Sequence, residues 1–190
     1  MRTQADKAAR FRELHQRPGA FIIPNPWDAG TAKLLAAMGF EALATTSLGV
    51  ANTLGQSTIS LDAIIENCRM IVEATDLPVN ADLENCGADD PKTAARAITR
   101  AAEAGVVGGS IEDSTGNREH PIYDFSLAVE RVQGHRVLAD LVPDGVLESG
   151  SSDPLAELED IAAGTPPLRD MAARLPGWLW GRHADGGWRL

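Results

Sequence analysis

Three acidic residues stand where two apolar, β-prone segments of the chain end. Asp82 and Glu84 lie two positions apart at the end of one segment, and Glu112 follows the next. Because side chains alternate along a strand, Asp82 and Glu84 are expected on one side and Leu83 on the other. Carboxylates that meet at neighbouring strand ends raise one another's pKa unless a positive charge lies between them. The pattern therefore points to a site that needs a cation.

The chain offers few cations of its own near these acids. It has three lysines, of which Lys33 and Lys92 fall on predicted helices. A hard divalent cation would neutralise the cluster, and Mg²⁺ suits it because Mg²⁺ binds one or two carboxylates directly and keeps several waters. The sequence therefore predicts a metal site at Asp82, Glu84 and Glu112. The alternative is that these acids are helix caps or solvated loop residues.

Polar residues elsewhere offer further candidate binding or catalytic groups. Thr45, Thr46 and Ser47 could bind an anion through their hydroxyl and backbone N–H groups, although such residues are equally common in ordinary turns. Asp28 is interpreted as a helix cap more readily than as a catalytic group. His120 lies in the loop 114–124, where a mobile lid could carry an acid or a base.

Other reaction types find little support in the sequence. Cys68 falls on the apolar face of a predicted helix, and nothing in the sequence activates Cys86 as a nucleophile. A Schiff-base mechanism needs a lysine, and none stands at a predicted strand end. The sequence has neither a phosphate-binding P-loop nor a dinucleotide-binding glycine motif.

The elements that must position these residues alternate along the first 132 residues. Apolar segments typical of strands cover 20–23, 42–46, 78–83 and 106–111, and helical signals cover 5–15, 29–38, 61–74, 91–104 and 125–132. Asp28, Ser60 and Asp90 are expected to cap three of these helices. The alternation implies parallel strands with right-handed crossovers, in a doubly wound sheet or a (β/α)8 barrel. A complete barrel takes at least about 200 residues, so a chain of 190 is short for one.

The alternation stops after Val132. A short strand at 137–141 and a short helix at 154–163 are the remaining signals, and three of the four tryptophans fall within the last 13 residues. We therefore predict a βα-barrel portion over residues 1–132 and a divergent tail over residues 133–190. A frame shift, a truncation and poor order of the tail are all open explanations.

Composition and charge limit the partners and the cellular compartment expected for the protein. The chain has a net charge of −10, which argues against nucleic acid and anionic membranes as partners. It contains no run of 18 apolar residues and no apolar signal core, and its two cysteines make no disulfide framework. These features predict a protein of the reducing cytoplasm.

Several of the candidate residues sit in short motifs. The motifs are PNPWDAG at 24–30, ATTS at 44–47, ADLEN at 81–85, GGSIED at 108–113 and PIYD at 121–124. In combination, over residues 10–132, they resemble the isocitrate lyase/phosphoenolpyruvate mutase superfamily, in particular its carboxyvinyl-carboxyphosphonate phosphorylmutase-like branch. The resemblance implies part of a (β/α)8 barrel, a homo-oligomer and Mg²⁺ as cofactor.

The resemblance also implies a reaction and roles for individual residues. Enzymes of the superfamily make or break a C–C or P–C bond next to a 2-oxo carboxylate, through an enolate-like intermediate, on a small 2-oxo acid or phosphonate. By motif position, Asp82 would bind the metal directly, and Glu84 and Glu112 would act through waters. The substrate carboxylate would be held by Thr45, Thr46 and Ser47, and the pocket would be walled by Trp27 and Asp28.

Three features depart from the superfamily's pattern. Gln56 stands where an acid is often found, and the loop 114–124 lacks the cysteine of isocitrate and methylisocitrate lyases. The arginine of a Thr-Ala-Arg-type motif on the fifth strand is not found. We therefore predict a Mg²⁺-dependent lyase or phosphonomutase-type enzyme. The alternatives are a catalytically inactive, truncated relative that binds metal or partner chains, and a hydrolase or decarboxylase of oxaloacetate-like acids.

Overall fold

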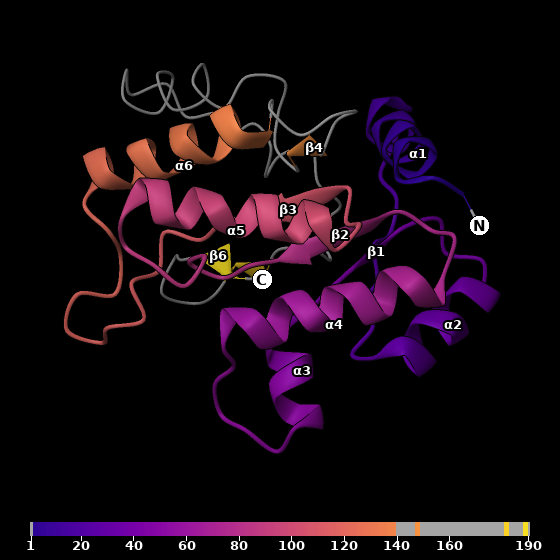
Figure 1. Ribbon diagram of the computed structural model, residues 1–190, viewed down its shortest axis with the longest axis horizontal. Coiled ribbons are helices and arrows are strands. Elements are labelled where there is room, and N and C mark those ends of the chain that lie inside the picture. The colour runs from indigo at the N-terminus through magenta and orange to yellow at the C-terminus, as the bar shows by residue number, and fades with distance from the viewer. Residues whose placement is uncertain (1, 140–146, 149–180, 183–187, 190) are drawn as a thin grey trace. The chain divides into compact units, whose positions relative to one another are not determined.

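The computed structural model describes residues 2–139, 147–148, 181–182 and 188–189 (Figure 1). The chain divides into two compact units, Met1–Ser149 and Gly150–Leu190. In the second unit, β5 (Gly181–Arg182) and β6 (Trp188–Arg189) form an antiparallel pair. The predicted helix at 154–163 lies outside the described residues. All candidate site residues belong to the first unit.

A four-stranded parallel sheet forms the framework of the first unit. Its strands are β1 (Leu43–Ala44), β2 (Val79–Asp82), β3 (Gly108–Ser110) and β4 (Leu147–Glu148), in the spatial order β1-β2-β3-β4. The register places Asp82 beside Ser110. The α/β class and three of the predicted strands are confirmed. The segment 20–23 is not a strand, although the backbone of Pro24 beyond it accepts a hydrogen bond from Ala44 N–H at 3.1 Å.

Six helices accompany the sheet in the described part of this unit. They are α1 (Gln4–Gln16), α2 (Ala29–Ala37), α3 (Ser47–Thr53), α4 (Leu61–Ala74), α5 (Pro91–Glu103) and α6 (Phe125–Ala139). The predicted caps are confirmed, because the side chains of Asp28, Ser60 and Asp90 each accept the backbone N–H three residues on. Helix α3, which was not predicted, begins at a cap formed by Thr46. None of the helices in the described residues is long and apolar enough to span a bilayer.

Helix α6 changes the predicted layout beyond Val132. It continues to Ala139, so the described residues 137–139 are helical and the predicted strand at 137–141 is wrong there. The predicted boundary between residues 132 and 133 falls inside this helix, which lies alongside α5 (Figure 1). Gly134 permits the close packing, because a Cβ there would lie 3.3 Å from the carbonyl oxygen of Pro91. Strand β4 then adds to the sheet beside β3, which the sequence did not predict.

The main core fills the space between the sheet and helices α2, α4 and α5. From the strands it takes Leu43, Val79, Ala81 and, just after β2, Leu83. Because side chains alternate along β2, this leaves Asn80 and Asp82 for the opposite face. Leu83 lies in the core as predicted, but β2 ends at Asp82 and Glu84 has a φ of 50°, so strand alternation does not place Glu84 on the side of Asp82.

Helix α1 packs at the other end of the strands from Asp82. Its buried residues Phe11 and Leu14 meet Ala42 and Val107, which precede β1 and β3. Lys7 is also buried, and its Nζ donates to the carbonyl oxygen of Thr75 at 2.8 Å, just beyond α4. The amino ends of the strands are thus covered, and the carboxyl ends carry the candidate site.

Candidate active site

Asp82 lies at the carboxyl end of β2, and its carboxylate accepts two backbone hydrogen bonds. Its Oδ2 accepts the backbone N–H of Ser47 at 2.9 Å, and its Oδ1 accepts the backbone N–H of Glu84 at 3.2 Å. These bonds come from two different segments and fix the orientation of the carboxylate. A carboxylate oxygen has two lone pairs, so each oxygen keeps one for a ligand.

Glu84 and Glu112 lie on the loops that follow β2 and β3. The backbone N–H of Glu112 donates to the carbonyl oxygen of Glu84 at 2.8 Å, so the two loops run together at this point. Partial burial raises the pKa of Glu112, and the charges of Asp82, Glu84 and Asp113 raise it further. Asp82, Glu84 and Asp113 therefore each lie within electrostatic reach of Glu112. In the described part of the chain, no three His, Cys, Asp or Glu side chains are placed to hold one metal ion together.

Polar groups of the segment Thr45-Thr46-Ser47 form hydrogen bonds within the protein, two of them with Asp82. The buried Thr45 hydroxyl accepts the backbone N–H of Asp82 at 2.9 Å. Thr46 caps α3 by accepting the N–H of Gly49 at 3.3 Å, and the N–H of Ser47 bonds to Asp82. The structure thus assigns these groups internal partners, and binding of a substrate carboxylate by them stays a prediction. The link between Ser47 and Asp82, which are 35 residues apart, leaves no pattern in the sequence.

Trp27 and Asp28 lie at the start of α2. Trp27 as a residue is 45% exposed. Its ring packs on α3 so closely that a Cβ on Gly49 would lie 2.5 Å from its Cδ1. The carbonyl of Trp27 accepts Asn67 Nδ2 at 2.9 Å. Asp28 caps α2 through Thr31, whose hydrogen bonds lower the Asp28 pKa. The role of Trp27 and Asp28 in forming a wall of the substrate pocket stays a prediction.

His120 lines a hollow that contains none of the three acids. It is exposed on the loop after β3, where Thr115 N–H donates to the Pro121 carbonyl at 3.0 Å. It lines an open hollow of about 590 Å³ together with Asp89 and Tyr123. The cavity beside Glu112 is a different one, and His120 is absent from its lining. A role for His120 as an acid or base therefore gains no geometric support.

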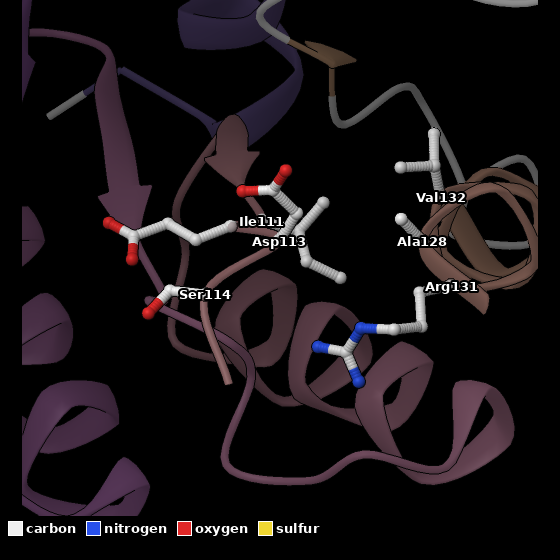
Figure 2. Close-up of a pocket in the computed structure, with 7 residues that line it drawn as sticks. Ile111, Asp113, Ser114, Ala128, Arg131 and Val132 are labelled. Atoms are coloured by element: carbon white, nitrogen blue, oxygen red, sulfur yellow. The ribbon is translucent and has the colours of Figure 1, made fainter. Parts of the chain in front are cut away.

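The cavity beside Glu112 lies between the loop after β3 and helix α6. It measures about 290 Å³ and is lined by Ile111, Glu112, Asp113, Ser114, Ala128, Arg131 and Val132. Figure 2 shows Arg131 extending from α6 on one side of it, with Asp113 and Ser114 on the other. Arg131 is only 1% exposed. Sequence reasoning missed it, because one arginine on a helix of weak amphipathicity carries no signal.

Both cysteines are predicted to be unreactive in the folded protein. Cys68 and Cys86 are buried free thiols, and burial raises the pKa of each to about 11. The thiolate fraction at neutral pH is therefore about one in ten thousand. A disulfide reagent should label the unfolded chain in seconds and the native chain orders of magnitude more slowly. Rapid labelling of native protein would contradict the buried placement.

Comparison with known proteins agrees with the fold. A family model described as phosphoenolpyruvate phosphomutase matches residues 11–141. The 2,3-dimethylmalate lyase of Eubacterium barkeri is 34% identical over 110 residues, which are 56% of this chain and 38% of that enzyme. A crystal structure of a candidate lyase/mutase from Burkholderia cenocepacia J2315 is 49% identical, with a TM-score of 0.76, and covers 90% of this chain and 60% of that one.

A more distant structure shares the fold. It is a phosphonopyruvate hydrolase in complex with oxalate and Mg²⁺, 14% identical, with a TM-score of 0.68 over 77% of this chain and 51% of that one. The chain spans less than half the length of curated relatives that it matches, 46% of a Mycobacterium tuberculosis protein for example. Because the family model covers more than half of its 190 residues, this chain belongs to the phosphoenolpyruvate phosphomutase family, within the isocitrate lyase/phosphoenolpyruvate mutase superfamily.

Proposed function

We propose that this chain carries the metal-binding part of a lyase or phosphonomutase-type active site. The reaction makes or breaks a C–C or P–C bond next to a 2-oxo carboxylate. The observation that carries the proposal is the group of carboxylates at the carboxyl ends of β2 and β3, where Asp82 is held by two backbone N–H groups and Glu112 has a raised pKa. In parallel βα folds, functional groups collect at this end of the strands.

The residues present fit Mg²⁺. The groups that raise the pKa of Glu112, beyond its partial burial, are all negative, so the cluster gains from a divalent cation. Asp82 is oriented and keeps lone pairs free, which suits a direct ligand. Mg²⁺ binds few carboxylates directly and keeps waters, so Glu84 and Glu112 need not reach the ion themselves.

Each group would have a separate task in the reaction. A bound divalent cation supplies electrophilic stabilisation of the negative charge that develops on an enolate-like oxygen. Asp82 would hold the cation, and Glu84 and Glu112 would act through waters. Trp27, held over α3, shields one side of the substrate from solvent. A small 2-oxo acid or phosphonate is the substrate class, in keeping with the names of the relatives.

We further infer that the sheet is part of a (β/α)8 barrel. A doubly wound sheet reverses its strand order at a switch point, whereas β1-β2-β3-β4 follow one another in chain order. Since a partial barrel leaves strand edges open, we propose that copies of the chain associate. We also propose that the protein acts in the cytoplasm and that the part of the chain beyond the family match, which ends at residue 141, has diverged.

A panel of substrates tests the proposed function. The full chain is incubated with 2-oxo acids, 2-hydroxy diacids and phosphonates, with Mg²⁺ or with a chelator. Turnover of at least one compound that needs Mg²⁺ is the expected result. Mg²⁺ binding without any turnover would favour the inactive relative. The absence of both Mg²⁺ binding and turnover would refute the proposal.

Replacing Glu112 with glutamine should have opposite effects with and without metal. Without metal, removal of one like charge should stabilise the protein slightly, by less than about 1 kcal/mol because Glu112 is exposed to solvent. With Mg²⁺, the gain in melting temperature should shrink. Thermal melts in chelator and in Mg²⁺ measure both, with Glu119→Gln as the control for an exposed acid. A loss of stability in chelator would contradict the electrostatic interpretation.

A further inference from the structure

Arg131 on α6 is a buried cation whose partners are backbone carbonyl groups. Its Nη2 donates to the carbonyl oxygen of Asn85 at 2.6 Å, and its Nη1 donates to that of Asp89 at 2.9 Å and to that of Ala88. A buried guanidinium is costly unless its N–H groups are hydrogen-bonded. Here the acceptors all belong to one loop, which joins β2 to α5.

That loop has a backbone conformation that needs outside support. Glu84 has a φ of 50° and Cys86 a φ of 59°, both in the left-handed region that disfavours residues other than glycine. Such residues persist where surrounding structure holds them. The bonds from Arg131 come from a helix 42 to 46 residues further along the chain, so they tie the loop to an element outside itself.

Tyr123 joins the second loop of the candidate site to the same arginine. Its ring lies 4.3 Å from the Arg131 guanidinium, and its hydroxyl donates to Asp89 Oδ1 at 2.6 Å. Its backbone N–H donates to the carbonyl of Asp113 at 2.9 Å, next to Glu112. One buried cation therefore contacts both the loop that carries Glu84 and the residue that ends the loop carrying Glu112.

We propose that Arg131 is a positioning residue of the candidate site. It holds the loop after β2 in the conformation that presents Glu84 to the metal, and through Tyr123 it keeps the loop after β3 in register with it. In this role Arg131 acts through the two loops and needs no contact with the metal or the substrate. The consequence for metal binding rests on the proposed function, whereas the consequence for loop order does not.

Two measurements on the full chain test the proposal. Binding of Mn²⁺, as a paramagnetic substitute for Mg²⁺, is followed by the loss of the free-ion signal in electron paramagnetic resonance. Amide hydrogen exchange is followed in the loop after β2, where the Cys86 N–H donates to Leu83. The variants are Arg131→Ala, Arg131→Lys and Tyr123→Phe. Arg96→Ala, which removes an exposed arginine of α5, is the matched control for lost charge.

Arg131→Ala should weaken Mn²⁺ binding by about 10- to 100-fold, the range found when groups that support metal ligands are removed. Loop amides should exchange about tenfold faster or more, while amides of α4 keep their protection. Arg131→Lys should show a defect of the same kind, because one amine cannot reach all three carbonyl groups. The defect should be smaller than that of Arg131→Ala, because lysine keeps the positive charge. Tyr123→Phe should weaken binding less than either.

The outcomes separate the two proposals. If the native chain binds no Mn²⁺, the proposed function fails and loop exchange alone decides the role of Arg131. Native-like binding and loop protection in a folded Arg131→Ala protein would overturn the positioning role. Should that variant fail to fold, Arg131→Lys decides: unchanged binding and exchange in it would refute the proposal.

Discussion

Replacing Asp82 with alanine should abolish the stabilisation of the protein by Mg²⁺. Among the described residues, the Asp82 carboxylate is the acid at the strand ends that two backbone N–H groups orient. Its loss therefore removes the proposed direct ligand and leaves groups that act through water. At a Mg²⁺ concentration about 100-fold above the dissociation constant, binding stabilises the native protein by about 2.7 kcal/mol. For a chain of this size that corresponds to a rise in melting temperature of about 5–10 °C. Thermal melts with and without Mg²⁺ should show this rise in the native chain only.

The control must separate loss of a ligand from loss of structure. Asp82→Ala also leaves the N–H groups of Ser47 and Glu84 without their acceptor, so the variant should be less stable by about 1–3 kcal/mol even without metal. The decisive quantity is therefore the difference between melts with and without Mg²⁺. Asp113→Asn removes a nearby charge that has no ligand role and should keep most of the rise. A full rise in Asp82→Ala would exclude Asp82 as the ligand.

The local features of this fold could be predicted because their causes are local. Asp28 and Asp90 cap helices through residues three positions away, a spacing visible in the sequence. The alternation that sends Leu83 to the core and Asp82 to the opposite face follows from strand geometry alone. The acidic cluster was predicted for the same reason, since parallel strands bring their carboxyl ends to one edge.

The remaining features depend on contacts between distant segments. The bond from Ser47 to Asp82 and those from Arg131 to the loop after β2 join residues 35 to 46 positions apart, and nothing in the composition of either partner marks them. Strand β4 is two residues long, too short for a periodic pattern. Helix α6 runs past the predicted end at Val132 because it packs on α5, a tertiary contact that its own weak amphipathicity does not reveal.

The position of α3 affects the orientation of the Asp82 carboxylate. The N–H of Ser47 sits in the first turn of α3, so the position of this short helix sets one of the two bonds that orient the carboxylate. The ring of Trp27 packs against the same helix at Gly49. A change at this contact should therefore act on stability and on the candidate site together.

Gly49→Ala is expected to be strongly destabilising, although alanine usually favours a helix. The added Cβ would lie 2.5 Å from Trp27 Cδ1 and 2.6 Å from Thr46 Cγ2, so the ring or the helix must move. Overpacking of this kind costs about 1–3 kcal/mol, a fall in melting temperature of about 2–12 °C. Displacement of α3 should also weaken the bond to Asp82 and lower Mn²⁺ affinity.

A double-mutant cycle with Trp27→Ala tests the origin of that loss. If the ring is the main obstacle, Gly49→Ala should cost less stability in the Trp27→Ala background than in the native chain. Asn52→Ala, at an exposed position of the same helix, should change stability little and serves as the control. Equal costs in both backgrounds would show that Thr46 rather than Trp27 limits the space. A native-like melt for Gly49→Ala would contradict the packing of Trp27 on α3, and with it the placement of Trp27 beside the substrate.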